Sequence, residues 1–351
     1  MRCLLYRSVV VVATSVLMLA GLGCGQSQRT DSEPSVSPKP ALIAWAVGDG
    51  GTLLATADGV TWSALQSSTK QDLNAASFVD STYGWVVGSG GTILHTDDGG
   101  TNWTAQDSGT TDDLQSVKFA DRMHGWAVGL RGTILATTDG GSSWVVQHSE
   151  ARVDLFGVTF CDASHGWAVG APATIIATAD GGAHWRTQWE NHGPAAFLFS
   201  VDSSDPSRAW AVGSFEKGAK LALAVTTADG GRSWVKRRCE TDQMLRGLYV
   251  ADETHGWAVG GATILATADG GVQWRVENWT GVAQPDSVDL KGVAFLDSQR
   301  GWAVGKAYSS SGGAVAVTLF TADGGAAWHL QHSIAGTGLN GVATARAGSG
   351  P

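Results

Sequence analysis

Seven aspartates in glycine-rich turns are the residues whose type and spacing most resemble a site for chemistry. Each follows a threonine by two residues and precedes a tryptophan by four or five. Carboxylates are ligands for hard cations, so calcium is one hypothesis. A lone turn carboxylate also accepts hydrogen bonds from the backbone N–H groups of its own turn. We favour this structural role for Asp58, Asp98, Asp139, Asp180, Asp229, Asp269 and Asp323.

Three histidines also share one position, because His124, His165 and His255 each precede a Gly-Trp pair. Imidazoles bind transition metals, but only when several converge on one ion. Equivalent positions on separate structural units lie too far apart for that. We therefore predict no metal site and no cofactor.

A catalytic site is not evident in the sequence. Sialidase-like glycosidases need an arginine cluster, a tyrosine nucleophile and an acid. Beyond the N-terminal segment the chain has only Tyr83, Tyr249 and Tyr308, and it lacks the Arg-Ile-Pro signature of that class. No Ser-His-Asp pattern appears either, so we assign no catalytic residue and predict that the protein is not an enzyme.

The turns belong to a longer repeated unit, of which Gly125–Trp144 is the clearest copy. Its copies recur about 40 to 47 residues apart, a period typical of propellers and repeat arrays. Each copy contains two tryptophans. The first tryptophans are Trp45, Trp85, Trp126, Trp167, Trp210, Trp257 and Trp302, and the second are Trp62, Trp103, Trp144, Trp185, Trp234, Trp274 and Trp328.

Each full unit contains four short segments with strand character. They are a Leu-x-x-Val-x-Phe segment, the Trp-Ala-Val-Gly segment, Thr-Ile-Leu-Ala-Thr, and a segment that begins at the second tryptophan. β-Branched and aromatic residues bounded by Gly, Asp and Asn favour strands, and four antiparallel strands make one propeller blade. The sequence therefore predicts an all-β, seven-bladed propeller.

The two ends of the repeat region predict how the ring closes. The first copy lacks its Leu-x-x-Val-x-Phe strand, whereas an additional strand of this type stands at residues 339–345. Pairing the two removes exposed sheet edges. We predict that blade 1 combines residues 42–66 with 339–345. The other blades are expected to start near Leu73, Leu114, Leu155, Phe197, Leu245 and Leu290.

The turn sequence carries a family resemblance. Thr178–Trp185 fits Ser/Thr-x-Asp-x-Gly-x-x-Trp, which resembles the Asp-box, or bacterial neuraminidase repeat, although the first copy, Thr56–Trp62, is one residue short. The whole unit resembles the photosystem II assembly and stability factor family over residues 42–345. That resemblance implies a non-enzymatic scaffold that holds a segment of a partner protein and aids assembly of membrane-associated complexes. The matching residues build blades, so they do not identify the partner.

The N-terminus resembles an export signal. Arg2 and Arg7 form a short basic region before Ser8–Gly23, an apolar stretch of signal-peptide length that ends before Cys24. This pattern resembles a bacterial lipoprotein signal. We therefore predict a signal peptide at 1–23, lipidation of Cys24, a flexible tether at 24–40 and a propeller at 41–351. The expected location is the cell envelope outside the cytoplasm, with the protein lipid-anchored to a membrane.

Composition narrows the class of partner. The chain has 351 residues, 16% of them charged, and a formal net charge of −9. An acidic protein is a poor match for nucleic acid. We expect a monomer with a protein partner, which the resemblance suggests is a membrane protein. Cys161 and Cys239 are expected to be free thiols, because their strand ends should lie on opposite faces and at different radii.

Departures from the repeat indicate where a partner binds. Blades 5 and 7 have long second-to-third connections at Ser214–Lys220 and Lys306–Gly313, and the link Trp279–Asp289 is also long. All three are expected on the face opposite the Asp-boxes. Aromatic loop residues on a rigid scaffold are typical of binding surfaces. The candidate partner-binding residues are Trp189, Trp279, Phe215, Tyr308, Arg186, Arg275, Lys236 and Arg238.

Two other interpretations of the same surface stay open. The insertions and extra tryptophans are alternatively structural, with the tryptophans covering loose blade ends. The second functional hypothesis is binding of carbohydrate or cell-wall glycan, and the third and least favoured is a sialidase-like glycosidase.

Overall fold

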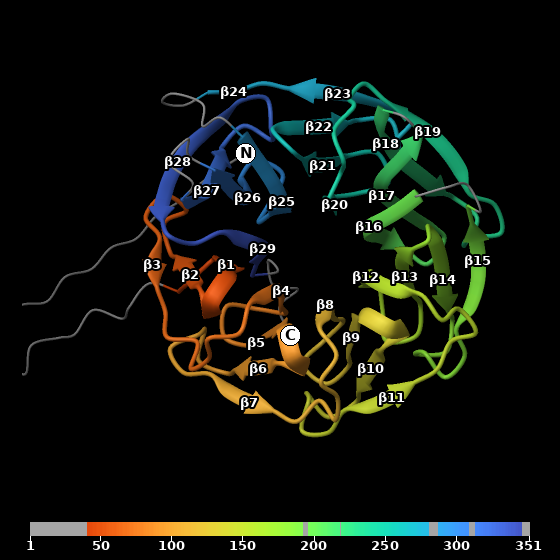
Figure 1. The fold of residues 1–351 in the computed structure, drawn as a ribbon, viewed down its shortest axis with the longest axis horizontal. Coiled ribbons are helices and arrows are strands. Elements are labelled where there is room, and N and C mark those ends of the chain that lie inside the picture. Colours follow the sequence, from red (N-terminus) through yellow and green to blue (C-terminus); the bar gives the residue numbers. More distant parts are fainter. Residues whose placement is uncertain (1–40, 192–195, 218, 281–286, 309–312, 346–351) are drawn as a thin grey trace, which may run out of the picture. The chain divides into compact units, whose positions relative to one another are not determined.

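The computed structural model describes residues 41–191, 196–217, 219–280, 287–308 and 313–345. These residues form seven antiparallel four-stranded blades around a central axis, as Figure 1 shows. The predicted seven-bladed propeller is thus confirmed. The predicted signal peptide, Cys24 and the tether lie outside the described residues. Among the residues described, no helix has the length and apolar character needed to cross a membrane.

Blades 1 to 4 are built as follows. Blade 1 contains β1 (Ala44–Gly48), β2 (Leu53–Thr56), β3 (Ser63–Ala64) and the C-terminal β29 (Leu339–Thr344). Blade 2 contains β4 (Leu73–Phe78), β5 (Gly84–Gly88), β6 (Ile93–Thr96) and β7 (Thr104–Gln106). Blade 3 contains β8 (Leu114–Phe119), β9 (Gly125–Gly129), β10 (Ile134–Thr137) and β11 (Val145–Gln147). Blade 4 contains β12 (Asp154–Phe160), β13 (Gly166–Ala171), β14 (Thr174–Thr178) and β15 (Arg186–Glu190). Short 3₁₀ turns join the second and third strands of blades 1 to 3: η1 (Asp49–Gly51), η2 (Ser89–Gly91) and η3 (Leu130–Gly132).

Blades 5 and 7 have longer strands, whereas the strands of blade 6 are four or five residues long. Blade 5 contains β16 (Ala196–Asp205), β17 (Arg208–Lys217), β18 (Ala219–Thr227) and β19 (Val235–Cys239). Blade 6 contains β20 (Gly247–Val250), β21 (Gly256–Gly260), β22 (Thr263–Thr267) and β23 (Gln273–Glu277). Blade 7 contains β25 (Ser287–Phe295), β26 (Gly301–Tyr308), β27 (Ala314–Thr321) and β28 (Trp328–Ala335), with the short β24 (Trp279–Thr280) beside β28.

The ring closes through the C-terminal strand, as predicted. β29 pairs antiparallel with β1, from Ala44 opposite Thr344 to Gly48 opposite Leu339. The backbone N–H of Ala345 also donates a hydrogen bond to the carbonyl of Ile43 at 3.0 Å. The strand that the first repeat lacks is therefore supplied from the other end of the chain.

Within each blade the first strand lies nearest the axis and the fourth lies at the rim (Figure 1). Because the strands alternate in direction, the first strand begins on the same face on which the second ends and the third begins. We call this the entry face. The Asp-box turns, between third and fourth strands, lie on the opposite face, which we call the Asp-box face. Every loop can be assigned to a face in this way.

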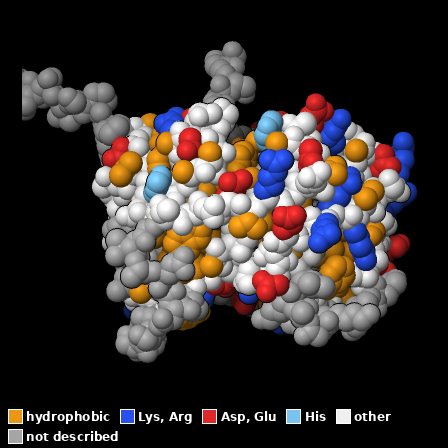
Figure 2. Space-filling model, turned by 90° about the horizontal axis from the view of Figure 1, so that it is seen from above, with side chains coloured by type: hydrophobic (Ala, Val, Ile, Leu, Met, Phe, Trp, Pro, Cys, Tyr) orange, Lys and Arg blue, Asp and Glu red, His pale blue; other side chains and the backbone are white. Residues whose placement is uncertain are grey.

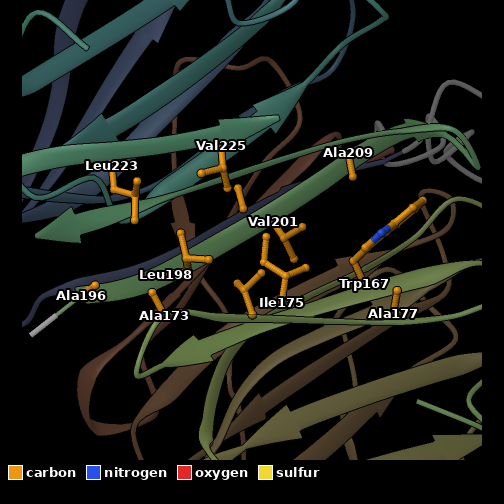
Figure 3. Packing of buried hydrophobic residues seen from close by; sticks show 12 residues of the cluster. Trp167, Ala173, Ile175, Ala177, Ala196, Leu198, Val201, Ala209, Leu223 and Val225 are labelled. Carbon is orange, nitrogen blue, oxygen red and sulfur yellow. The ribbon is translucent and has the colours of Figure 1, made fainter. Parts of the chain in front are cut away.

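Stacked aromatic rings hold neighbouring blades together at four of the junctions, between blades 1 and 2, 2 and 3, 3 and 4, and 6 and 7. The indole of Trp126 on β9 lies parallel to the ring of Phe160 on β12, with centroids 3.5 Å apart. The second tryptophan of the next blade, Trp185, meets Phe160 edge-on at 5.8 Å. Such stacked and edge-on pairs bury large apolar areas in favourable electrostatic geometry. The aliphatic cluster between blades 4 and 5, drawn in Figure 3, fills the same layer with Val, Ile, Leu and Ala side chains.

A glutamine on the fourth strand also bridges each regular pair of blades. Gln147 Oε1 accepts a hydrogen bond from the Trp185 indole at 3.0 Å, and Gln147 Nε2 donates to the carbonyl of Gly181 at 3.0 Å. A Cβ at Gly182, whose φ is +90°, would collide with this amide, so the second turn glycine is needed for the bridge. We call these residues bridging glutamines; the four are Gln106, Gln147, Gln188 and Gln331.

The junctions between blades 1 and 2, between blades 5 and 6 and between blades 6 and 7 lack this bridge, and in blade 1 the position is held by Leu65. The register pairs Ile134 with Gln147 in blade 3 but Ile264 with Glu277 in blade 6. In blade 5 the position is held by Arg237. At the last two of these junctions the outer strands pair in parallel, β19 with β23 and β24 with β28. A parallel bridge between Ser149 and Trp185 also joins blades 3 and 4, where the bridging glutamine is present.

Two sequence predictions about the entry face need correction. Ser214–Lys220 was predicted as an inserted loop, but the residues described there extend strands β17 and β18 into a longer hairpin, with Phe215 opposite Leu221. Trp189 was predicted in a link between blades, yet it lies in β15 opposite Ile175. Residues that continue the strand period lengthen the ladder rather than forming a loop, because pairing satisfies their backbone groups.

Candidate functional site at the channel mouth

The seven first strands each place one side chain at the entry-face mouth of the central channel. This residue directly follows the leucine that begins each first-strand repeat. The mouth encloses a pocket of about 220 Å³. Its side chains, in blade order from 1 to 7, are Asn340, Asn74, Gln115, Phe156, Phe199, Arg246 and Lys291.

The mouth has an aromatic side and a basic side. The rings of Phe156 and Phe199 lie 5.5 Å apart on blades 4 and 5, and both are half-buried. The guanidinium of Arg246 stands 5.2 Å from the centroid of the Phe199 ring, within range of a cation–π interaction. An apolar surface and a positive group therefore adjoin each other at one opening.

Lys291, on the basic side, is a half-buried ammonium group whose charged form is disfavoured by its surroundings. Its Nζ donates to Asn340 Oδ1 at 2.8 Å. Burial lowers the pKa of Lys291 to about 8, with a further contribution from the neighbouring Lys306. Asp289 and Asp49 offset part of this charge, since Asp289 accepts from Arg246 at 3.3 Å and Asp49 lies 3.9 Å from Lys306. A carboxylate from a partner would stabilise the charged ammonium further.

The amide side of the mouth is already engaged with the protein. Asn74 Nδ2 donates to the carbonyl of Leu114 at 2.8 Å, and Asn340 Nδ2 donates to that of Leu73 at 3.1 Å. These bonds tie first strands of adjacent blades together. Blades 1 to 3 therefore form a fixed wall, whereas aromatic and basic groups on blades 4 to 7 face the opening.

Below the mouth the channel contains a cavity of about 470 Å³. Lys118 on blade 3 and Asp202 on blade 5 form an ion pair there at 3.9 Å. Asp202 also accepts hydrogen bonds from Thr159 Oγ1 at 3.1 Å and from the backbone of Val250 at 2.9 Å. This carboxylate therefore ties blade 5 to blades 3, 4 and 6.

The predicted partner-binding residues do not form one surface. Trp189 and Phe215 lie together near the entry face, with Lys236 Nζ 5.8 and 5.1 Å from their ring centroids. Both rings are half-buried against the core between blades 4 and 5, rather than exposed as expected. Lys236 is exposed beside them. These three residues make a small cationic and aromatic patch on the rim.

The other predicted residues are dispersed. Trp279 is half-buried against blade 7, and its indole donates to the carbonyl of Ala262 at 2.9 Å, which makes it a structural contact. Tyr308 is 43% exposed at the end of β26. Arg186 begins β15 and Arg275 lies in the middle of β23, both fourth strands that start at the Asp-box face, while Arg238 is exposed further along the rim. Figure 2 shows Lys and Arg side chains gathered over one half of the rim in view, with acidic side chains between them.

The turn aspartates are bonded within their own turns, as predicted. Asp139 Oδ1 accepts from Thr137 Oγ1 at 2.8 Å and from the backbone of Ser143 at 2.9 Å. The hydrogen bonds from Ser143 lower the pKa of Asp139 to about 2. The shortened first copy keeps the bond from Thr56 to Asp58 at 3.0 Å and adds backbone donors from Val60 and Thr61.

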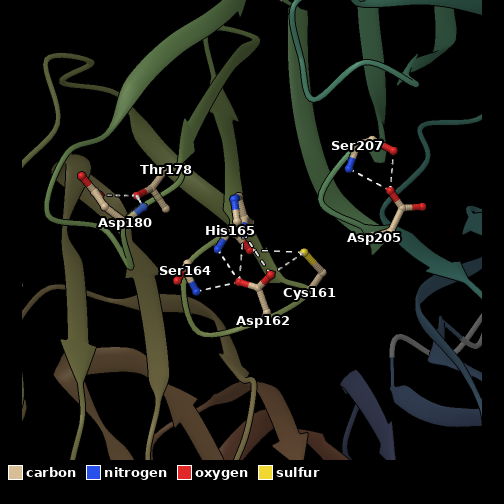
Figure 4. A network of polar contacts seen from close by, with 8 residues as sticks. All are labelled: Cys161, Asp162, Ser164, His165, Thr178, Asp180, Asp205 and Ser207. Atoms are coloured by element: carbon tan, nitrogen blue, oxygen red, sulfur yellow. Dashed lines mark hydrogen bonds and ion pairs between the residues drawn. The ribbon is translucent and has the colours of Figure 1, made fainter.

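The histidines are likewise used locally. Figure 4 shows Asp162 accepting backbone bonds from Ser164 and His165, with His165 Nδ1 2.9 Å from its second oxygen. His124 and His255 contact Asp121 and Asp252 in the same way. In the part of the chain that the structure describes, no three His, Cys, Asp or Glu side chains are grouped to hold a metal ion.

Both described cysteines are free thiols and half-buried. Burial raises the pKa of Cys161 to about 11 and that of Cys239 to about 12. Thiols with such values are largely protonated at neutral pH and are weak nucleophiles. They are not candidates for chemistry.

Sequence reasoning missed the channel mouth. A signal was present, since the residue after each first-strand leucine varies through amide, aromatic and basic types while its neighbours repeat. Comparing that single register across the seven copies would have identified it.

Comparisons with known proteins agree with the fold. A family model described as photosynthesis system II assembly factor YCF48 matches residues 39–108, 103–156, 147–247 and 228–339. A comparison with curated protein sequences gives no significant match.

Several solved structures share the fold of this chain. YCF48 from Cyanidioschyzon merolae superposes with a TM-score of 0.56 at 19% identity, over 74% of this chain and 85% of that one. A structure described as YCF48 bound to D1 peptide gives 0.58 at 19% identity, over 91% and 100%. The GH74 enzyme of Niastella koreensis gives 0.54 at 13% identity, over 82% and 55%. At these identities the similarity shows a shared fold.

Proposed function

Because the chain belongs to the photosynthesis system II assembly factor YCF48 family, we propose that it is a non-enzymatic assembly scaffold that holds a segment of a partner protein. The segment binds at the entry-face mouth of the channel. The observation that carries this proposal is the adjacency of Phe156 and Phe199 to the basic pair Arg246 and Lys291.

The chemistry of the mouth favours an extended peptide with an apolar side chain next to a carboxylate. Apolar atoms would cover the two phenylalanine rings, and the carboxylate would accept charge-assisted hydrogen bonds from Arg246 and Lys291. One structure of this fold is described as bound to a D1 peptide, which supports a peptide as the class of ligand.

The proposed setting is the cell envelope. An export signal at 1–23 and a lipid on Cys24 would hold the propeller at a membrane, with residues 25–40 as the tether. A membrane protein that is being assembled would then be the natural partner. Radiolabelled palmitate incorporation that disappears in Cys24→Ser would support the anchor.

The experiment that tests the function is site-specific photo-crosslinking in cells. A photoreactive phenylalanine analogue replaces Phe199 at the mouth or, as a matched position, Trp189 on the rim. We expect a protein adduct from position 199, and its yield should fall about tenfold in the double variant Arg246→Gln, Lys291→Gln, which is the loss of about 1.4 kcal/mol of binding. The control is Arg238→Gln, which removes an exposed rim charge.

Two results would contradict the proposal. Adducts from position 189 that depend on Lys236 would move the partner to the rim patch. Adducts that contain glycan and no protein would replace the scaffold by the carbohydrate-binding alternative.

A further inference from the structure

A hollow of about 440 Å³ opens at the rim of the entry face, where the chain passes from blade 3 to blade 4. Three of its lining residues are basic and none is acidic; the lining consists of Arg131, Gly132, His148, Ser149, Ala151 and Arg152. This local charge is opposite to the formal net charge of −9 of the whole chain. The hollow shares no residue with the channel mouth, and the proposed function makes no use of it.

The hollow exists because the link that follows blade 3 takes a different course from the link of equal length that follows blade 2. In blade 2 the link packs on the turn between the second and third strands, where a Cβ at Gly91 would collide with the carbonyl of Thr110. For a Cβ at the equivalent Gly132, the nearest atom would be the carbonyl oxygen of Val153, at 3.5 Å. Gly91 is buried, whereas Gly132 is half-buried. The link after blade 3 therefore stands off the turn and leaves a space beside it.

Two substitutions within the repeat account for this course. The link after blade 2 passes through the left-handed region at Gly109, whose φ is +68°, whereas Glu150 holds the same register with a negative φ. A residue with a Cβ enters the left-handed region only at a cost. The next residue is Thr110 in blade 2, and its Oγ1 accepts from the backbone N–H of Asp112 at 3.1 Å. Ala151 stands there after blade 3 and has no hydroxyl group to close the link in this way.

The basic side chains around the hollow have donors available for a ligand. Arg152 and His148 are exposed, and neither side chain has a hydrogen bond or ion pair with another described residue. Arg131 has a φ of +58° in the register where Gly90 has +64°, and its guanidinium pairs with Asp112. Because a guanidinium carries five N–H donors, and that of Arg131 is 69% exposed, the ion pair leaves donors of Arg131 unused.

Three basic groups around one open hollow match an anion that has more than two acceptor oxygens. A carboxylate presents two oxygens in one plane, whereas a phosphate group presents three strong acceptor oxygens around the phosphorus. Guanidinium groups form bidentate, charge-assisted hydrogen bonds with phosphate. A volume of about 440 Å³ is typical of small-molecule sites, so the hollow also has room for the group that carries the phosphate.

We propose that this hollow binds the phosphate group of a phosphate ester, carried by a soluble small molecule or by the headgroup of a phospholipid. Arg152 and His148 donate to the phosphate oxygens, and Arg131 supplies a third donor while it keeps its ion pair with Asp112. This site is separate from the channel mouth, so it does not depend on the peptide proposed to bind there.

The test is isothermal titration calorimetry of the full-length protein with three probes. Glycerol 3-phosphate represents a soluble monoester, glycerophosphoglycerol represents the headgroup of phosphatidylglycerol, and acetate is the matched carboxylate. We expect saturable binding of a phosphate probe and none of acetate. Tighter binding of the monoester would identify a soluble ester as the source of the phosphate, and tighter binding of the diester would identify a lipid headgroup. Binding of neither phosphate probe, or equally tight binding of acetate, would overturn the proposal.

A pair of charge variants locates the binding. Arg152→Gln should weaken the binding of the phosphate probe about tenfold, because it removes a charge-assisted hydrogen-bond donor. Lys70→Gln is the matched control, since Lys70 is an exposed cation in the same register of the link after blade 1. It should leave the affinity unchanged. An equal loss in both variants would mean that the phosphate responds only to the overall charge, and would contradict a site in the hollow.

A double variant tests the shape of the hollow without removing any cation. Glu150→Gly with Ala151→Thr gives this link the Ser-Gly-Thr sequence found after blade 2, so the link should close onto Gly132. Binding of the phosphate probe should be lost although an acidic residue has been removed, and the melting temperature should be at least that of the wild type. Unchanged or tighter binding in this folded variant would show that the hollow is not the site.

Discussion

The junction between blades 3 and 4 and the junction between blades 6 and 7 solve the same packing problem differently. In the first, Trp126 stacks on Phe160 with an interplanar angle of 5° and donates to the carbonyl of Gly181 at 2.9 Å. In the second, Trp257 lies on Phe295 at 3.9 Å with an angle of 23°, and its indole nitrogen has no hydrogen-bond partner among the described residues. The change from Gln147 to Glu277 accompanies this tilt.

The difference shows that two blades can be held together by two kinds of contact. Where a bridging glutamine is present, its amide satisfies the indoles and the turn carbonyl. Between blades 6 and 7, backbone pairing of β24 with β28 holds the rim, and the indole nitrogens of Trp257 and Trp328 have no hydrogen-bond partner among the described residues. Repeat architecture can therefore give up a side-chain bridge at one junction without opening the ring.

The largest effect should come from breaking the ring at its closing strand. Deleting residues 338–351 removes β29 and with it Leu339, which is fully buried. Loss of one such leucine costs about 2–5 kcal/mol, so we expect the melting temperature to fall by at least about 4 °C. Differential scanning calorimetry measures this change.

The matched truncation removes residues 346–351 alone and should leave the melting temperature unchanged. If the deletion of 338–351 also melted like the full chain, closure by β29 would contribute no stability. The side-chain contacts of blade 1 with blades 7 and 2 would then be sufficient.

A smaller change in the free energy of unfolding should distinguish a junction that has a bridging glutamine from one that lacks it. Trp85→Phe and Trp257→Phe remove the same atoms, but Trp85 donates to the carbonyl of Gly140 at 3.1 Å, whereas the Trp257 indole has no acceptor in the part of the chain that the structure describes. We expect Trp85→Phe to be more destabilising by about 1–2 kcal/mol, the cost of a lost buried hydrogen bond. Urea unfolding of both variants at the same pH gives the two free energies. Equal losses would mean that the Trp257 indole is bonded in solution.

How far the sequence could predict these features depends on whether a residue repeats. The tryptophans, the turn aspartates and the leucine of each first strand recur, so their roles in the blades and the closure by residues 339–345 could be inferred. The bridging glutamine was also visible, three residues after the second tryptophan, but its meaning required knowing that Gln147 reaches Trp185 in the next blade.

The candidate site was harder to predict, because it depends on how far each strand lies from the central axis of the propeller. Trp189 and Phe215 looked exposed since they fell outside the repeat, yet tertiary packing buries half of each against the core between blades 4 and 5. Phe156 and Arg246 sit on strands that read as ordinary first strands. Only the ring brings positions separated by about one blade length together at one mouth. A single sequence does not show which strand face lines a channel.

The smallest expected effect is a pH dependence of opposite sign in the two regions. The Asp-box carboxyl groups have lowered pKa values, with Asp139 and Asp180 at about 2. Their stabilising contribution is present above the ordinary value of 3.8 and is lost as the pH falls towards 2. Burial raises the pKa of Glu277 above its ordinary value of 4.5, with Arg275 opposing and Asp323 adding to the shift. The contribution of Glu277 to stability is therefore fully present below pH 4.5. It is lost as the pH rises from 4.5 through the raised pKa of the folded protein.

Glu277→Gln removes that titration and should raise the melting temperature more at about pH 7 than at about pH 4. The reason is that the protonated Glu277 already lacks the charge that burial opposes, so the variant has less to gain in acid. Gln147→Glu in the regular junction should show the reverse, with a loss of stability at neutral pH that acid partly restores, because only a protonated carboxyl group can still donate to the carbonyl of Gly181. Thermal melts of the wild-type protein and both variants across this range measure the three profiles. Parallel profiles would mean that the carboxyl group at Glu277 is fully hydrated, and that the two junctions differ in geometry but not in electrostatics.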